Sequence, residues 1–404
     1  MTATPAIAEP YRRQGSPLEV LRAFARLGVA SFGGPIAHLG YFRAEFVERR
    51  HWLDERAYAD LVALCQFLPG PASSQVGFSL GLMRAGYLGG LAAWLGFTLP
   101  SAILLVAFAY GANALNGRLG AGLLHGLKLV AVAIVAQAVL GMARTLAPDR
   151  PRASIAVLAL IVMALSPASL AQIGAIVLGA LAGLAFCRGE THEAPEPASF
   201  PISRRMGLLF LGLYVLLLVL SFAPARDDAL ALAGAFYRSG ALVFGGGHVV
   251  LPLLRSAIVA PGWVSDGAFL AGYGAAQAVP GPLFTFAAYL GAVAAIPPGG
   301  GAGGALALVA IFIPGLLALM AALPFWRDLS GRRRARAAMA GINAAVVGLL
   351  GAALYNPVFV SAVQSPIDFA IAAAGFVLLV VWRAPPLIVV ALTALAGFGV
   401  AAIG

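Results

Sequence analysis

The chain has 404 residues and a formal net charge of +10, and its composition is strongly apolar. Hydrophobic residues make up 61% and charged residues 10%, against about 45–50% and about 25% in soluble domains. The mean hydropathy is +0.92. Such a chain cannot cover itself with a solvated surface, which excludes soluble enzymes and disordered scaffolds. Its apolar runs have the length of membrane helices rather than of barrel strands of about 10 residues, so we predict an all-α polytopic membrane protein.

In chain order, residues 1–16 form an N-terminal tail without the apolar core of a cleaved signal peptide, so the first membrane helix must direct insertion. A first repeat then occupies residues 17–187 and a second occupies residues 229–404. Between them, residues 188–206 carry three Glu and three Pro and predict a cytoplasmic linker, and residues 207–222 predict an extra transmembrane helix. Within the first repeat we expect spans at 87–112, 123–146, 153–165 and 168–187, with four equivalents in the second repeat.

The repeat is visible in the sequence itself. Residues 24–35 align without a gap with residues 236–247, and six of these positions are identical. The internal repetition indicates two copies of one structural unit. The same order continues in further matched pairs: Trp52 with Trp263, residues 66–71 with 277–282, Pro100 with Pro314, Gly126 with Gly341, and Lys128 with Asn343.

The loop charges indicate that the two repeats are inverted in the membrane. Residues 43–56 contain four Lys or Arg residues, whereas the equivalent residues 255–266 contain one. Residues 113–120 contain one, whereas the equivalent residues 327–336 contain five. Because cytoplasmic loops carry the excess of positive charge, we predict two inverted-topology repeats joined by the extra helix, with the N-terminus in the cytoplasm and the C-terminus outside.

Two segments of the first repeat contain helix-breaking residues. Gly33 and Gly34 lower helix propensity, and Pro35 cannot continue a helix from the preceding turn. The segment Pro69–Pro71 interrupts the next run in the same way. Both segments must enter and leave the membrane on one side to keep the charge pattern, so we expect broken or re-entrant helices. Such backbone occurs where it is buried in protein or lines a wet cavity, and the alternative is a turn that only lets helices pack.

These breaks favour an anionic substrate. A helix that restarts at Pro35, Pro71 or Pro282 presents free N–H groups and the positive end of its dipole to the break. A cation site would need carboxylates, which the apolar runs almost lack. Charged side chains at membrane depth are functional candidates, unless they extend to the membrane surface. The basic residues in or near the apolar runs are Arg26, Arg84, Lys128 and Arg238.

Five further polar residues lie near the breaks. His38, His125 and His248 could carry protons during transport or could be hydrogen-bonded packing residues. Gln66 and Gln277 precede the two Pro-Gly-Pro segments by three residues. Their amides could donate hydrogen bonds to an oxyanion or could cap the break.

The remaining composition limits the partners. Most of the 25 Arg residues cluster in short loops, as topology determinants beside anionic membrane lipid do, so the basic charge does not indicate nucleic acid binding. Cys65 and Cys187 lie far apart in apolar sequence and predict neither a disulfide framework nor a metal site. We expect no cofactor. The oligomeric state is left open, with a homodimer among the alternatives.

The paired breaks resemble a known family. Residues 32–35 with His38, the Pro69–Pro71 segment, and residues 244–248 followed by Pro252 are similar to the paired signatures of the chromate ion transporter family, in its long form with two homologous halves. The resemblance covers nearly the whole chain apart from the tail, the linker and the extra helix. It implies a secondary transporter of the bacterial inner membrane that exports chromate from the cytoplasm, with the proton motive force as the driver and protons as a second partner.

The resemblance and the breaks together give one set of substrate-binding candidates. The first repeat contributes Arg26, Phe32, Gly33, Gly34, Pro35, Gln66, Pro69, Gly70, Pro71 and Lys128. The second repeat contributes Arg238, Phe244, Gly245, Gly246, His248, Gln277, Pro280, Gly281 and Pro282. The two repeats are not strictly equivalent, because Gly247 stands in the place of Pro35 and Phe286 stands near the place of Gln75.

Three alternatives accompany this prediction. Chromate and sulfate are tetrahedral dianions of similar size, so sulfate or another oxyanion could be the substrate. A passive anion channel would use the same groups without coupling. An intramembrane enzyme would need a nucleophile with a base, paired carboxylates or a metal-binding set, and no such motif occurs in the sequence. We therefore expect no enzyme.

Overall fold

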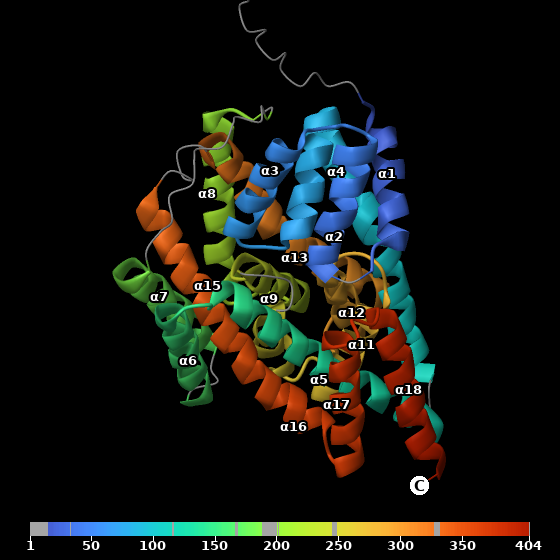
Figure 1. Cartoon of the computed structure of the whole chain (residues 1–404). Helices are drawn as coiled ribbons and strands as arrows, with labels where there is room; N and C mark the ends of the chain where they lie inside the picture. Colours follow the sequence, from blue (N-terminus) through green and yellow to red (C-terminus); the bar gives the residue numbers. More distant parts are fainter. Residues whose placement is uncertain are drawn as a thin grey trace, which may run out of the picture.

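The computed structural model describes residues 15–32, 34–114, 117–165, 169–187, 200, 202–244, 249–326 and 332–403 (Figure 1). This part of the chain is predominantly helical and contains no strand, as the sequence predicts. The first copy comprises α1 (Pro17–Ala30), α2 (Gly34–Phe42), η1 (Arg43–Arg49), α3 (Glu55–Phe67), α4 (Ala72–Ala114), α5 (Arg118–Leu146), α6 (Arg150–Leu165) and α7 (Ser169–Phe186). The next helix, α8 (Arg204–Ser221), matches the predicted extra span.

The second copy follows the same order. It comprises α9 (Asp228–Ala241), α10 (Val250–Leu254), η3 (Arg255–Val259), α11 (Asp266–Ala278), η4 (Leu283–Thr285), α12 (Phe286–Val293), α13 (Gly300–Ala322), η5 (Leu323–Phe325), α15 (Arg333–Ala353), η6 (Leu354–Phe359), α16 (Val360–Ala362), α17 (Pro366–Val380) and α18 (Pro386–Ile403). In the part of the chain that the structure describes, five stretches are long and apolar enough to cross a membrane, which makes this a multi-pass membrane protein. They are Ala72–Gly111, Leu119–Leu146, Arg204–Ser221, Gly300–Phe325 and Arg333–Ala362.

Helix α4 consists of two helices that meet at a tight turn. Gly86 has φ +68° and ψ −159°, which is far from helical geometry. The two arms lie close together because Gly81 faces Gly89, and a Cβ on Gly81 would overlap the carbonyl oxygen of Gly89. In the second copy Gly291 of α12 faces Gly303 of α13 in the same way. The turn at Gly86 directly precedes the span that the sequence predicts at residues 87–112.

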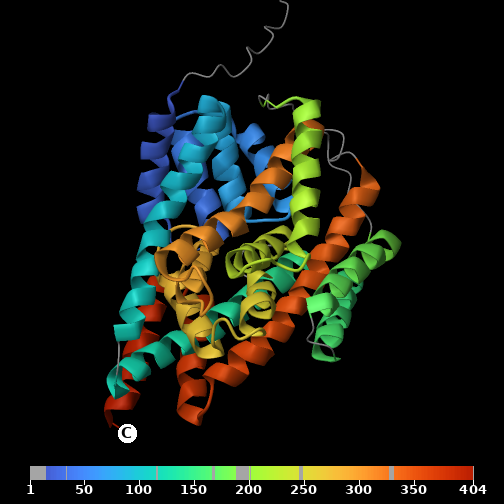
Figure 2. The same ribbon diagram turned by 180° about the vertical axis from the view of Figure 1, so that it is seen from behind.

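The two copies are intertwined. Helices α6 and α7 pack against α15, and α17 and α18 pack against α5 (Figures 1 and 2). A Cβ on Gly126 of α5 would overlap the carbonyl oxygen of Thr393 in α18, and a Cβ on Gly341 of α15 would overlap that of Gly179 in α7. Each copy therefore packs its last two helices against a helix of the other copy. The matched glycines Gly126 and Gly341 allow the close helix contact at equivalent places in the two copies.

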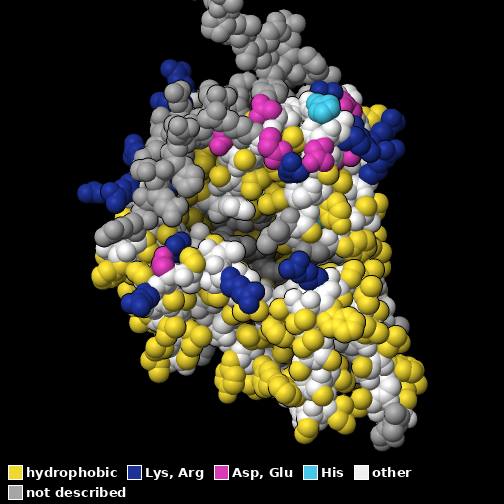
Figure 3. All heavy atoms as spheres, in the orientation of Figure 1, with side chains coloured by type: hydrophobic (Ala, Val, Ile, Leu, Met, Phe, Trp, Pro, Cys, Tyr) yellow, Lys and Arg dark blue, Asp and Glu magenta, His cyan; other side chains and the backbone are white. Residues whose placement is uncertain are grey.

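Charged side chains are unevenly distributed. On the face shown in Figure 3, most of them lie over the upper end, a few lie across the middle, and none is seen in the lower part, where hydrophobic side chains predominate. Two ion pairs occupy equivalent places in the copies. Arg43 Nε lies 2.7 Å from Glu55 Oε1, and Arg255 Nε lies 2.8 Å from Asp266 Oδ1. In each copy the Arg begins a π-helical turn and the carboxylate lies in the first turn of the next helix.

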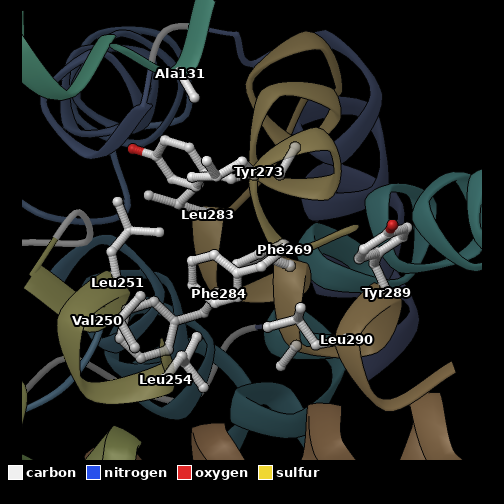
Figure 4. Packing of buried hydrophobic residues seen from close by; sticks show 14 of the residues in the cluster. Ala131, Val250, Leu251, Leu254, Phe269, Tyr273, Leu283, Phe284, Tyr289 and Leu290 are labelled. Carbon is white, nitrogen blue, oxygen red and sulfur yellow. The ribbon is translucent and has the colours of Figure 1, made fainter. Parts of the chain in front are cut away.

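The largest hydrophobic core lies mainly in the second copy (Figure 4). It contains large aromatic side chains that contact one another, such as Phe269 and Phe286, whose ring centroids are 5.2 Å apart in an edge-to-face arrangement. Tyr273 and Phe284 are also fully buried there. Because such rings fill space and offer little hydrogen bonding, this core fixes the position of the second break without providing a polar site.

Candidate functional site

The two copies are joined at their breaks by a reciprocal pair of backbone hydrogen bonds. The N–H of Gly281, in the Pro-Gly-Pro segment of the second copy, donates to the carbonyl of Ser31 at 2.9 Å. The N–H of Gly70, in the Pro-Gly-Pro segment of the first copy, donates to the carbonyl of Val243 at 2.9 Å. Ser31 and Val243 are equivalent positions in the repeat alignment. Each break is therefore held by the Pro-Gly-Pro segment of the other copy.

Each Pro-Gly-Pro segment also packs onto the proline-containing helix of the other copy. Gly70 has φ +115°, and a Cβ there would lie 2.7 Å from the Cα of Gly315 in α13. Gly281 has φ +100°, and a Cβ there would lie 2.7 Å from the Oγ of Ser101 in α4. Both positions favour glycine because of the left-handed backbone, and at Gly70 the neighbouring backbone also leaves no room for a side chain. Gly315 follows Pro314 directly, as Ser101 follows Pro100.

Buried polar side chains gather around the first break. We call Ser31, His38, Ser73, Thr98 and Ser101 the polar break cluster. They come from the end of α1, from α2 and from α4, and each is at most 2% exposed.

His38 is the centre of this cluster. Its Nδ1 lies 3.5 Å from Ser73 Oγ. The ring packs edge-on against Phe97 of α4, with the centroids 5.1 Å apart. One turn further along α4, the Oγ of Ser101 donates to the carbonyl of Thr98 at 3.1 Å. The cluster therefore lies where two helices of the first copy meet the Pro-Gly-Pro segment of the second.

Several polar atoms of the cluster have no protein partner in the described part of the chain. These atoms are His38 Nε2, Ser31 Oγ and Thr98 Oγ1. Leaving a buried polar atom without a partner costs about 1–3 kcal/mol. Imidazole and hydroxyl groups can all donate hydrogen bonds, and the cluster contains no carboxylate. The arrangement therefore suits a guest that accepts hydrogen bonds from several directions.

Two helix N-termini add positive potential at the same place. Helix α2 begins at Gly34, close to His38, and α4 begins at Ala72, next to Ser73. The first N–H groups of each helix are not used within the helix, and the dipole makes each N-terminus favourable for an anion by about 0.3–2 kcal/mol. Hydrogen-bond donors, two positive helix ends and the lack of a carboxylate together favour a negatively charged, oxygen-rich guest.

Gln75 links the cluster to the second copy, and the sequence reasoning missed its role. It is fully buried, and its Nε2 donates to the carbonyls of Pro69 at 2.9 Å and Gly315 at 2.8 Å. Its Oε1 has no partner among the described residues. A signal was present, because Ser73, Ser74 and Gln75 are consecutive polar residues that open an apolar run.

The candidates of the first repeat divide into two groups. Phe32, Gly34, Pro35, Pro69, Gly70 and Pro71 lie at the breaks, half-buried or buried. Gly34 has φ +78°, and α2 begins at this residue, one position before the predicted start. Arg26, on α1, and Gln66, on α3, are exposed at the surface instead. Lys128 of α5 is half-buried beside Gly267, at the start of α11, away from the cluster. Gly33 lies outside the described residues.

The candidates of the second repeat also divide. Phe244 lies at the second break, in the segment that follows α9. Pro280, Gly281 and Pro282 form the second Pro-Gly-Pro segment, which contacts the first break through Gly281. Gln277 is half-buried, and its Nε2 has no partner in the described chain. Arg238 lines a separate pocket. The predictions for Gly245, Gly246 and His248 fall outside the described residues.

Three details add to the sequence predictions. The N–H groups of Gly70 and Gly281, which precede the predicted helix restarts at Pro71 and Pro282, each donate to a carbonyl of the other copy. Arg84 is paired with Glu19 in the first turn of α1, with Nη2 and Oε1 3.1 Å apart. His125 Nε2 lies 2.8 Å from Asp368 Oδ1, so a buried carboxylate does occur, although away from the breaks.

Comparison with known proteins gives the family. A family model described as "Chromate transporter" matches residues 18–184 and residues 230–398, one match in each repeat. The chain belongs to the chromate transporter family. Members of this family are transport proteins, so the chain is a multi-pass membrane transport protein and not an enzyme.

Relatives with curated names agree with this assignment. The chromate transport protein of Pseudomonas aeruginosa is 28% identical over 397 residues, covering 94% of this chain and 91% of the relative. A probable chromate transport protein of Synechococcus elongatus is 27% identical over 341 residues, covering 83% of each chain. The chromate transport protein of Cupriavidus metallidurans is 24% identical over 359 residues, covering 87% of this chain and 84% of the relative. No solved structure matches the chain.

Proposed function

We propose that this protein exports chromate from the cytoplasm across the bacterial inner membrane and binds it at the polar break cluster. The observation that carries the proposal is the set of buried donors without partners, His38 Nε2, Ser31 Oγ and Thr98 Oγ1, beside the N-termini of α2 and α4. A tetrahedral dianion offers four oxygens that can accept these hydrogen bonds. Membrane relatives named as chromate transport proteins support chromate as that dianion.

The two copies would act as inverted repeats around this site. The reversal of loop charge between the copies supports opposite orientations in the membrane. The reciprocal hydrogen bonds from Gly281 to Ser31 and from Gly70 to Val243 support a site at the interface of the repeats. Because His38 and Ser73 are buried, the described arrangement is closed around the cluster. Transport then requires the copies to move relative to one another, so that the cluster opens to each side in turn.

The proton motive force is the proposed energy source. With a negative cytoplasm, the membrane potential favours the exit of a dianion by about 4.6 kcal/mol per 100 mV. A passive channel would use that electrical energy as well, so the potential alone does not indicate coupling. His38 is the titratable side chain of the cluster and would bind a proton at the substrate site. Proton coupling is therefore the property to test directly.

The decisive experiment measures uptake of labelled chromate into inside-out membrane vesicles. With the potential clamped at zero by valinomycin and potassium, an imposed gradient with an acidic lumen should still drive accumulation, and a protonophore should abolish it. Uptake that follows the potential but not the pH gradient would identify a passive channel. No chromate uptake under any gradient would contradict the proposal.

The same vesicles decide the substrate. Excess sulfate should compete weakly if the cluster is adapted to chromate. Equal competition, together with uptake of labelled sulfate at a similar rate, would replace chromate by a general tetrahedral oxyanion. Empty-vector vesicles with matched total protein are the control for other anion carriers.

A further inference from the structure

A cavity lined by an arginine lies outside the polar break cluster. This cavity of about 290 Å³ lies between α7, the end of α8, α9 and η3, and it is lined by Arg238 together with Ser239, Leu242, Ala257 and others. At about 30 Å³ per water molecule, this space holds about ten waters. It can therefore hold a small anion together with part of its hydration shell.

Arg238 is the charged group of this cavity. Its side chain is half-buried on α9, and its guanidinium carbon lies 5.3 Å from the ring centroid of Phe222. In the described part of the chain Arg238 forms no ion pair with a carboxylate, whereas Arg43 and Arg255 each do. A guanidinium that is partly removed from water and not neutralised attracts an anion, and its planar donors suit two oxygens at once.

The cavity adjoins the junction of the two copies. Leu242 lines it, and the next residue, Val243, accepts the backbone hydrogen bond from Gly70. The cavity is therefore one residue away from the second break, while the polar break cluster surrounds the first. An anion held by Arg238 would lie next to the segment that must move for the cluster to open.

We propose that the Arg238 cavity is a second oxyanion site, in series with the polar break cluster on the transport path. The identity of the anion rests on the proposed function, whereas the existence of the site does not. The tetrahedral oxyanion that binds the guanidinium could be the transported ion or the phosphate group of a lipid. We assign it to the transported ion, because the space beside Arg238 is large enough to hold the ion with part of its hydration shell.

The equivalent residue of the first copy provides a matched control. Arg26 occupies the position of Arg238 in the repeat alignment but is exposed on α1. If anion binding depends on the cavity and not only on a basic residue at this alignment position, substitution of Arg238 should weaken anion binding and substitution of Arg26 should not.

The test uses cysteine labelling, which needs no transport. In a background with Cys65→Ala and Cys187→Ser, Ala257→Cys places a thiol in the cavity wall. Purified protein in neutral detergent is treated with a negatively charged and a positively charged methanethiosulfonate, with and without sulfate or chromate. The negative reagent should react at least several-fold faster than the positive one, and either oxyanion should slow it at least twofold. Arg238→Gln should remove both effects, whereas Arg26→Gln should leave both unchanged.

The outcomes separate this proposal from the proposed function. Oxyanion protection that requires Arg238 supports the site, even if the vesicles show no proton coupling. If neither oxyanion protects the thiol while nanodiscs containing phosphatidylglycerol do, the cavity binds a lipid phosphate and the proposal is wrong. Equal reaction rates for the two reagents would also overturn it. Arg238→Lys, which keeps the charge, should restore part of the preference for the negative reagent.

Discussion

At the first break His38 faces Ser73, whereas at the equivalent place in the second copy Val250 and Phe284 lie in the hydrophobic core (Figure 4). The other cluster positions follow the same rule. Ser31, Thr98 and Ser101 correspond in the repeat alignment to Val243, Phe312 and Gly315. Each residue of the polar break cluster is thus matched by an apolar residue or glycine in the second copy.

The scaffold around the two breaks is nevertheless the same. Both copies have a π-helical turn that begins with an Arg, a Pro-Gly-Pro segment with a left-handed glycine, and a long helix containing a proline. Duplication has preserved the backbone while the chemistry has diverged. We infer that one break was kept as a polar site, and that the other became a packed support against which the site is held.

The largest expected effect on transport comes from replacing His38 by valine, the residue that occupies the equivalent position in the second copy. His38→Val should lower the initial rate of chromate uptake at low chromate by about 10- to 150-fold, which corresponds to losing about 1.5–3 kcal/mol from a hydrogen bond to a charged group. The measurement is vesicle uptake normalised to the amount of protein by immunoblot. The matched control is Val250→Ala in the second copy, where uptake should stay within about twofold. Full activity of His38→Val at normal abundance would remove the polar break cluster from the mechanism.

The two Pro-Gly-Pro glycines should differ in how severely alanine destabilises the protein. Gly70→Ala places a Cβ against the backbone of Gly315, which cannot move aside, so we expect a loss of about 2–5 kcal/mol from left-handed strain and overlap together. Gly281→Ala meets the Ser101 side chain, which can rotate, and the carbonyl oxygen of Phe97 at 3.1 Å, which needs only a small shift, so about 1–2 kcal/mol of strain should dominate. Thermal unfolding in detergent measures both.

Gly34→Ala is the control for this pair. Gly34 also has a positive φ, but no described atom lies within 4 Å of the place its Cβ would take. Its loss of stability should therefore resemble that of Gly281→Ala and not that of Gly70→Ala. Equal destabilisation by all three variants would show that the contact with Gly315 is unimportant.

Removing the hydroxyl of Thr98, which has no partner in the described chain, should affect the stability of the free protein and the binding of chromate in opposite directions. Thr98→Val keeps the shape of the side chain and deletes a buried polar atom without a partner, so the protein without substrate should become more stable by about 1 kcal/mol. Its stabilisation by added chromate should decrease. Thr393→Val is the matched control, because the Thr393 hydroxyl already donates to Val389 at 3.0 Å, so this variant should not become more stable. A loss of stability in Thr98→Val would indicate that the hydroxyl is satisfied within the protein.

The smallest effect is expected at the equivalent ion pairs. Glu55→Gln and Asp266→Asn should each cost at most about 1 kcal/mol, because the first pair is exposed, the second is partly exposed, and both are screened by salt. The two variants should behave alike in unfolding experiments and should retain transport. A large loss in one copy alone would show that the scaffold, and not only the site, has become asymmetric.

The sequence by itself determined the membrane class, the duplication and the places where helices break. Hydropathy and run length predict apolar helices, and the alignment of residues 24–35 with 236–247 predicts equivalent breaks. Gly and Pro act on the backbone locally, so their effects at Gly34, Gly70 and Gly281 can be predicted from neighbouring residues alone. The family follows from the same motifs.

The tertiary structure decided which polar residues lie at the site. Gln66 and Gln75 lie on either side of the first Pro-Gly-Pro segment, and the sequence favours Gln66. In the structure Gln66 is exposed, while Gln75 donates to the carbonyl of Gly315, 240 residues away. Arg26 and Arg238 are likewise equivalent in sequence, yet one is exposed and the other lines a cavity. Burial and partners depend on how distant segments pack, and here the intertwining of the two copies sets that packing, which no local pattern records.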